Sequence, residues 1–203
     1  MTTTPKLRHD VVALDMGGVV VDVDKDAPGR RLRLPFARIE PALFGSRFHP
    51  PMSQGAPRSV DAFIDHAVDV LSDVPRADVI AAWSDVVSAK SGAVDVVRRL
   101  RRPAVAWSNT DPLHFARFSA QLPQGLFSAQ RCLSFEVGAD KPDLAFYRAG
   151  LAKLDGVAAD RVLFIDDKDE NVAAARQLGI DAHRAEGLAA VVDVLQRFHL
   201  LDA

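Results

Sequence analysis

The sequence is poor in residues that cross-link a chain, and it has no long apolar stretch. Cys132 is the one cysteine among 203 residues, so no internal disulfide can form, which agrees with a reducing compartment. No run reaches the roughly eighteen apolar residues of a membrane-spanning helix, and residues 1–10 lack the apolar core of a signal peptide. The formal net charge of −2 gives no general attraction to nucleic acid or anionic lipid. We therefore predict a cytoplasmic monomer or homodimer that binds neither nucleic acid nor membranes.

Three short runs of apolar, often β-branched residues are present instead: Val11–Leu14, Ala104–Trp107 and Val162–Ile165. Continuous apolar runs of this length are typical of strands that are covered on both faces, as in a parallel sheet. Helical patterns follow the last two runs. They begin at Pro112, at Pro142 and at about Asp169, and the third ends at Gly179. This alternation predicts an α/β fold built on a doubly wound parallel sheet.

Residues 24–92 interrupt the alternation, because they contain no convincing buried strand. One helix is predicted from about Ser59 and a second from about Pro75, the latter with Val79, Trp83, Val86 and Val87 on one face. We therefore predict a core domain of residues 1–23 and 93–203, with a small, mostly helical insert of residues 24–92 after the first strand. Such an insert is expected over the C-terminal end of that strand, where α/β sheets bind their ligands.

Polar residues follow each of the three apolar runs. Asp15 follows the first run, Ser108 the second, and Asp166 and Asp167 the third. The carboxyl ends of parallel strands meet at one edge of a sheet, so these side chains are expected to lie together. A carboxylate after a buried strand is costly unless a cation or hydrogen bonds compensate it. Grouped carboxylates suit a hard cation, and we predict Mg²⁺.

Three further residues fit a site that takes up a phosphate group. Gly17 and Gly18 remove side-chain bulk where a ligand approaches the backbone, although they are equally consistent with a tight turn after the strand. Lys141, just before a proline, supplies a positive charge, although a lysine considered alone is more often a solvated surface residue.

Four segments together resemble the motifs of the haloacid dehalogenase-like hydrolases. The segments, in chain order, are Asp15-Met16-Gly17-Gly18-Val19, Trp107-Ser108-Asn109-Thr110, Gly138-Ala139-Asp140-Lys141-Pro142-Asp143, and Phe164-Ile165-Asp166-Asp167-Lys168-Asp169-Glu170-Asn171. Each stands at a predicted strand end or helix start, and the matched region spans nearly the whole chain outside the insert. The resemblance implies a magnesium-dependent phosphatase that acts on a small phosphorylated metabolite, plausibly a sugar phosphate.

The resemblance also implies a role for each matched residue. Asp15 is expected to be the nucleophile, which forms an aspartyl-phosphate intermediate. The carbonyl group of Gly17 and the carboxylate of Asp167 are expected to join Asp15 on the metal, with Asp166 and Asn171 in support, directly or through water. The residues expected to hold the transferring phosphoryl group are Ser108, Asn109, Lys141 and Gly18. In the family, the insert after the first motif is a helical cap that closes over the site and selects the substrate. This makes Arg47 and His49 candidates for substrate contact.

One position departs from the family pattern. Most phosphatases of the family have an aspartate two positions after the nucleophile, as general acid and base, and Gly17 stands there in this sequence. Another group, such as His49 or Asp22, or water would have to supply the proton. Two alternatives stay open: a 2-haloacid dehalogenase, which uses the same nucleophile without metal, and a non-catalytic protein that binds phosphate.

Overall fold

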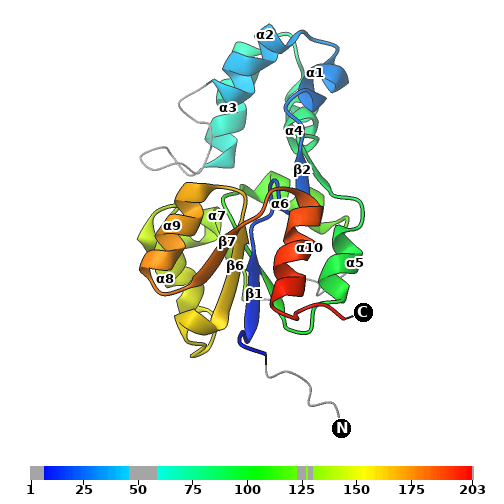
Figure 1. The fold of residues 1–203 in the computed structure, drawn as a ribbon. Helices are drawn as coiled ribbons and strands as arrows, with labels where there is room; N and C mark the ends of the chain where they lie inside the picture. Colours follow the sequence, from blue (N-terminus) through cyan, green and yellow to red (C-terminus); the bar gives the residue numbers. More distant parts are fainter. Residues whose placement is uncertain (1–6, 46–58, 123–126, 128–129, 203) are drawn as a thin grey trace.

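The computed structural model describes residues 7–45, 59–122, 127 and 130–202, and it contains a five-stranded parallel sheet (Figure 1). The strand order is β5-β4-β1-β6-β7, and helices lie on both faces of the sheet. The strands are β1 (Val11–Leu14), β4 (Ala104–Ser108), β5 (Cys132–Leu133), β6 (Val162–Asp166) and β7 (Asp181–Arg184). The predicted α/β fold with a doubly wound parallel sheet is confirmed.

The first strand, β1, lies at the centre of the sheet, where its side chains fill both layers of the core. It pairs in parallel with β4 on one side and with β6 on the other. Because side chains alternate along a strand, Val12 and Leu14 pack into the core layer of α5 and α10, whereas Val11 and Ala13 pack into that of α8 and α9. All four residues are buried, which is why β1 is continuously apolar.

The helices around this sheet agree with the sequence patterns, with small shifts at their ends. Asp111 caps α6 by accepting hydrogen bonds from two backbone amides. The helix predicted from Pro142 begins two residues later, because the Asp143 side chain accepts a hydrogen bond from the Ala145 amide and caps it there. The helices of the core are α5 (Ala93–Arg98), α6 (Pro112–Ser119), α7 (Ser134–Val137), α8 (Leu144–Ala152), η2 (Ala159–Arg161), α9 (Asp169–Gln177) and α10 (Gly187–Arg197).

A group of helices lies over the C-terminal end of β1 (Figure 1). These inserted helices are α1 (Ala27–Leu32), α2 (Phe36–Ile39), the π-helical turn η1 (Glu40–Phe44), α3 (Val60–Val70) and α4 (Arg76–Ser84). The chain reaches them along β2 (Val21–Val23) and returns along β3 (Val87–Ala89), and these two strands pair antiparallel. Among the described residues, no helix has both the length and the apolar composition needed to cross a membrane.

The strand β3 lies within residues 24–92, where no convincing buried strand was expected, and only its first residue is buried. The predicted helical face that combined Val79 and Trp83 with Val86 and Val87 is wrong in its second half, because α4 ends at Ser84. Val87 belongs to β3, where it pairs with Val23. Three residues with one buried side chain are too few to show the alternation of a strand in the sequence. The partner strand β2 also lies far away along the chain.

Candidate active site

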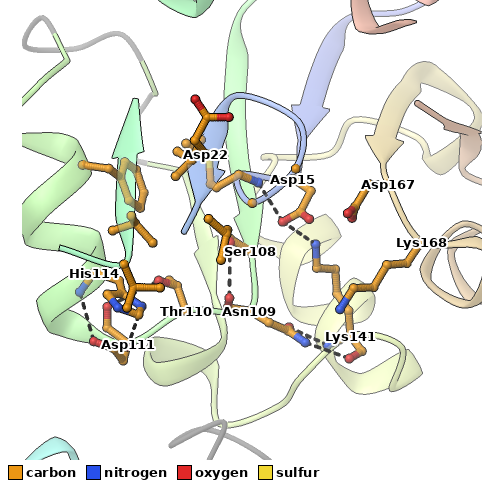
Figure 2. A pocket seen from close by; sticks show the side chains of 18 of the residues that line it. Asp15, Asp22, Ser108, Asn109, Thr110, Asp111, His114, Lys141, Asp167 and Lys168 are labelled. Carbon is orange, nitrogen blue, oxygen red and sulfur yellow. Dashed lines mark hydrogen bonds and ion pairs between the residues drawn. The ribbon is translucent and has the colours of Figure 1, made fainter. Parts of the chain in front are cut away.

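The polar ends of three neighbouring strands meet in one pocket of about 810 Å³. Asp15 follows β1, Ser108 ends β4 and Asp167 follows β6, and all three side chains line this pocket (Figure 2). Lys141, from the loop before α8, lies beside them. The structure therefore brings together the residues that were predicted as nucleophile, phosphate ligands and metal ligands.

Lys141 is buried, with 5% of its surface exposed, in contrast to an ordinary surface lysine. Its Nζ atom lies 2.8 Å from Asp15 Oδ1 and 2.6 Å from Asp166 Oδ2, and it donates a hydrogen bond of 2.9 Å to the carbonyl oxygen of Trp107. The ammonium group thus has three acceptors around it, two of which belong to carboxylates. Lys141 is held in one place between the strand ends.

Burial and ion pairing act in opposite directions on the pKa values of this cluster. Burial is the largest effect on Asp15 and raises the pKa of its carboxyl group to about 6, although the charge of Lys141 acts to lower it. Burial also acts to lower the pKa of Lys141, but the charges of Asp15 and Asp166 outweigh it and hold that pKa above its ordinary value. Near neutral pH the pair is therefore an ammonium ion beside a carboxylate.

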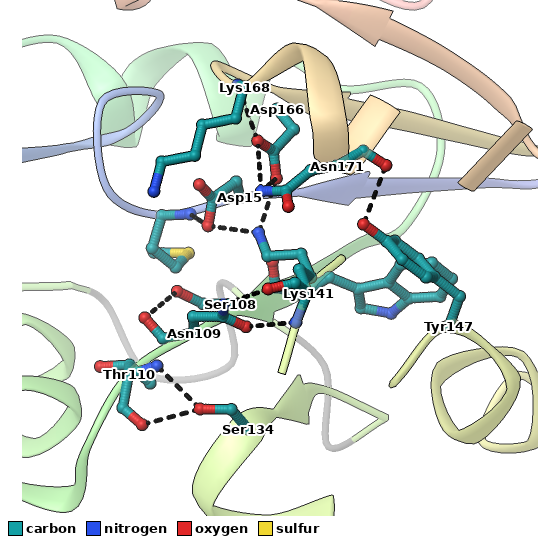
Figure 3. Close-up of polar contacts among 12 residues, drawn as sticks. Asp15, Ser108, Asn109, Thr110, Ser134, Lys141, Tyr147, Asp166, Lys168 and Asn171 are labelled. Carbon is teal, nitrogen blue, oxygen red and sulfur yellow. Dashed lines mark hydrogen bonds and ion pairs between the residues drawn. The ribbon is translucent and has the colours of Figure 1, made fainter. Parts of the chain in front are cut away.

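Asp166 is fully buried and its two carboxylate oxygens are occupied by hydrogen bonds (Figure 3). Asn171 donates to both oxygens, at 2.9 and 3.1 Å, and the backbone amide of Lys168 donates to Oδ1 at 2.9 Å. The Tyr147 hydroxyl group in turn donates to the carbonyl oxygen of Asn171. Asp166 therefore orients Lys141 and the start of α9, and it faces the pocket less directly than Asp15 and Asp167.

A cation fits beside Asp167. Carboxylate oxygens of Asp15, Asp166 and Asp167 lie within 4.8 Å of one another. Asp167 Oδ1 is buried and has no hydrogen-bond partner among the described residues. Burial, and then the charge of Asp166, raise the pKa of Asp167 above its ordinary value. A buried carboxylate oxygen without a donor is costly, and a hard divalent cation is a ligand that would compensate it.

Gly18 allows Asp167 to come close to the loop after β1. Its φ angle is +74°, and a Cβ atom at this position would lie 2.4 Å from Asp167 Oδ2. Any side chain at residue 18 would therefore be strained and would push the Asp167 carboxylate away. Gly17 also lines the pocket, and the role of its carbonyl group as a metal ligand stays a prediction.

The side chain of Asn109 holds the backbone of Lys141. Asn109 Nδ2 donates to the Lys141 carbonyl oxygen, and the Lys141 amide donates to Asn109 Oδ1, both at 2.8 Å. Asn109 was predicted to contact phosphate, but its side chain is already used to position the lysine. Ser108, which is 2% exposed, lines the pocket together with this pair. Arg47 and His49, the predicted substrate contacts, lie outside the described residues.

The far side of the pocket holds a polar cluster that the sequence analysis did not predict. His114 Nδ1 lies 3.0 Å from Asp111 Oδ2, and His114 Nε2 lies 2.8 Å from the carbonyl oxygen of Trp83. Trp83 Nε1 also donates to Asp111 Oδ2, at 3.1 Å, and the Trp83 and His114 rings stack at 4.3 Å. Both nitrogens of His114 thus lie within hydrogen-bonding distance of an oxygen atom, one of Asp111 and one of Trp83.

Burial acts to raise the pKa of Asp111. The hydrogen bonds and the charge of His114, together with the hydrogen bond from Trp83, outweigh burial, so the pKa of Asp111 lies below its ordinary value. Trp83, Asp111 and His114 thus connect α4 to α6. In the sequence, the three-residue spacing of Asp111 and His114 is the signal that could have indicated this cluster. A second link runs through Asp85, whose carboxylate pairs with Arg31 of α1 and with Arg117 of α6.

Comparisons with known proteins agree with this architecture. The family model for haloacid dehalogenase-like hydrolases matches residues 9–179. A sesquiterpene phosphatase of Aspergillus oryzae is 42% identical over 60 residues, which span 29% of this chain and 30% of that protein.

Two solved structures share the fold. A haloacid dehalogenase-family enzyme of Bacteroides thetaiotaomicron, in complex with magnesium and inorganic phosphate, has a TM-score of 0.72 at 21% identity and covers 88% of this chain and 94% of its own. A predicted hydrolase of the same kind from Porphyromonas gingivalis has a TM-score of 0.73 at 22% identity, over 93% of this chain and 98% of its own.

Proposed function

The chain belongs to the haloacid dehalogenase-like hydrolases, and from this we propose that it is a magnesium-dependent phosphomonoesterase of small phosphorylated metabolites. The observation that carries the proposal is the arrangement of Asp15, Lys141 and Asp167 at the strand ends, with one buried oxygen of Asp167 lacking a donor among the described residues. A nucleophilic carboxylate, a fixed ammonium group and a cation site are what phosphoryl transfer to an aspartate requires.

Two of the similar proteins support this choice by what they are described to do. The Aspergillus oryzae relative is a phosphatase, and the Bacteroides thetaiotaomicron enzyme holds magnesium and inorganic phosphate. In our proposal Asp15, Asp167 and the Gly17 carbonyl group hold Mg²⁺, and Asp166 supports them. When bound, Mg²⁺ would supply positive charge that lets a phosphate dianion approach a carboxylate.

The contacts of Asp15 assign different roles to its two oxygens. The Met16 amide donates to Oδ1 at 2.7 Å, and Lys141 Nζ lies 2.8 Å from the same atom, so the carboxylate is fixed and Oδ2 is left to attack. A bond forms between Oδ2 and phosphorus, while the ester P–O bond breaks and its electrons go to the leaving oxygen. Water then hydrolyses the aspartyl phosphate, which releases phosphate and restores the carboxylate.

The leaving oxygen takes its proton from water in this proposal, because Gly17 carries no acid. Asp22 lines the pocket, but its carboxylate forms an ion pair with Lys90. General acid catalysis contributes about 10²–10⁴-fold in rate, so turnover is expected to be slow for poor leaving groups. The inserted helices act as the cap that closes off the pocket and selects the substrate.

Phosphate release from a panel of phosphorylated metabolites tests the proposal. Release that requires both Mg²⁺ and Asp15, with Asp15→Asn as the control, is the expected result. The absence of any release above the Asp15→Asn control would refute it.

The absence of an acid at Gly17 leaves two alternative functions, and two further assays on the same protein distinguish them from the phosphatase. Beryllofluoride binding with Mg²⁺ and no turnover would favour a phosphate-binding protein without catalysis. Halide release from a chlorinated propionate without Mg²⁺ would favour a dehalogenase.

A further inference from the structure

The pocket is much larger than a phosphate group needs. Its volume of about 810 Å³ falls within the range of about 300–1,000 Å³ that is typical of sites for ligands of drug size. Figure 2 places Asp15, Lys141 and Asp167 on one side of the pocket and Asp111 with His114 on the other. The second side therefore has to accommodate the alcohol part of the ester.

The wall around that second part is rich in apolar side chains. They come from five elements: Val23 from β2, Phe44 from η1, Trp83 from α4, Val87 from β3 and Phe118 from α6. Phe44 and Phe63 flank the Trp83 ring, with centroid distances of 5.9 and 4.7 Å. Val23 is one of the few large apolar side chains with substantial exposure, at 52%, and its Cγ2 atom lies 3.4 Å from where a Cβ of Gly17 would be. An apolar surface thus begins directly beside the loop of the nucleophile.

Three polar side chains in the same part of the pocket, those of Asp22, Lys90 and His114, already have partners, and Lys25 lies over the Phe44 ring at 5.9 Å. Asp22 forms an ion pair with Lys90, and both nitrogens of His114 are engaged by Asp111 and by the Trp83 carbonyl group. A sugar placed here would have to bury hydroxyl groups against donors and acceptors that already have partners. Each such group left without a hydrogen bond is unfavourable, whereas an apolar chain gains from the same surroundings.

We propose, on the basis of the phosphatase function above, that the substrate is the phosphate monoester of an apolar alcohol and that Val23 and Phe44 select it. This replaces the sugar phosphate expected from the sequence. The phosphate group lies against Asp15 and Lys141, and the hydrocarbon part extends along β2 and η1 toward Trp83.

The first experiment measures kcat/KM for methyl, butyl and octyl phosphate and for a hexose phosphate, with Mg²⁺. The leaving groups of the alkyl esters are all primary alcohols or methanol, with similar chemistry. Differences in kcat/KM along the series therefore report contacts between the protein and the alkyl group. Each fully buried methylene group is expected to raise kcat/KM up to about fourfold, from a transfer free energy of about 0.8 kcal/mol. A hexose phosphate that is hydrolysed faster than octyl phosphate would overturn the proposal.

A binding measurement separates this proposal from the phosphatase function itself. Methyl, butyl and octyl phosphonate are not hydrolysed, and their affinities can be measured by calorimetry with Mg²⁺ in the unaltered protein. Affinity that rises with chain length supports the apolar site even if no ester is turned over. Equal affinities along the series would overturn the apolar site while leaving phosphatase activity intact.

A matched pair of variants tests the wall. Val23→Ser is expected to reduce the ratio of octyl to methyl phosphate kcat/KM by about 3–10-fold, since it removes apolar contact beside the nucleophile loop. Val70→Ser makes the same change on α3 at a similarly exposed residue (40%) that does not line the pocket, and it should leave the ratio unchanged. Equal ratios in the two variants would exclude Val23 from the substrate site.

Discussion

Replacing Lys141 by methionine is the perturbation with the largest expected effect on stability. Lys141 Nζ lies 2.8 Å from Asp15 Oδ1 and 2.6 Å from Asp166 Oδ2. With an effective dielectric constant of about 20, Coulomb's law gives about 6 kcal/mol of attraction for each contact before desolvation is subtracted. Removing one partner of such a buried pair costs about 3–5 kcal/mol, because the remaining charges stay buried without compensation.

The pH dependence of Lys141→Met follows from the pKa of Asp15. Burial raises this pKa to about 6 even with the lysine present, so removal of the ammonium group raises it further. A carboxyl group whose pKa is higher in the folded state than in the unfolded state favours folding at low pH, and that contribution is lost as the pH rises through the folded pKa. The variant is therefore expected to lose less stability at pH 5 than at pH 8.

Urea denaturation at these two pH values, with and without Mg²⁺, measures the effect. Mg²⁺ that binds the folded protein should restore part of the lost free energy of unfolding. Lys168→Met is the matched control, because Lys168 lines the same pocket but is exposed, and its removal should change stability by about 0.5 kcal/mol or less. A loss below about 1 kcal/mol for Lys141→Met at pH 8, or the same loss at both pH values, would refute the reasoning.

Three further substitutions test other parts of the site. Gly18→Ala is expected to weaken Mg²⁺ binding by about 10–100-fold in calorimetry, because the added Cβ atom displaces the Asp167 carboxylate. Gly156→Ala is the control, because Gly156 also has a positive φ angle, +85°, but has open space around it. It should cost about 1–2 kcal/mol of stability and leave the Mg²⁺ affinity unchanged. Asn109→Ala removes two hydrogen bonds from the Lys141 backbone and should lower the free energy of unfolding by about 1–3 kcal/mol and reduce kcat; unchanged stability would contradict the positioning role. Asp111→Asn should destabilise the protein above pH 4. Because the pKa of Asp111 is lowered in the folded state, the difference in stability between wild type and variant should disappear as the pH falls through that pKa. A difference that stays constant when stability is measured along an acid titration would contradict the role of the Asp111 carboxylate.

The sequence predicted the parts of the fold that depend on local pattern. Val11–Leu14 and Val162–Ile165 are strands because they are continuously apolar and lie at the centre of the sheet. The edge strand Asp181–Arg184 mixes apolar and charged residues, and Cys132–Leu133 is two residues long, so neither carries a strong strand signal. Short strands at an edge are defined by their neighbours more than by their own composition.

The site was predictable in its residue types but not in its environment. The family motifs identified Asp15 and Lys141, yet considered alone the lysine resembled a surface residue. Its burial depends on contacts with Asp166 and with the Trp107 carbonyl group, which form only when the loop before α8 packs against the strand ends. The link from Trp83 to His114 was missed for the same reason, because it joins two helices that meet only in the folded chain.

The ribbon of β2 and β3 has a consequence for how this chain could diversify. Val23 and Val87 face each other across it, so the chain leaves the core and re-enters it at nearly the same point. The described residues between them supply no strand to the sheet of order β5-β4-β1-β6-β7 and none of the residues at its strand ends. The bond-breaking groups and part of the surface that meets the alcohol, including Phe44 and Trp83, are thus encoded in separate stretches of sequence. A library that varies residues 24–86 alone would change this part of the pocket wall while Asp15, Lys141 and Asp167 stay the same.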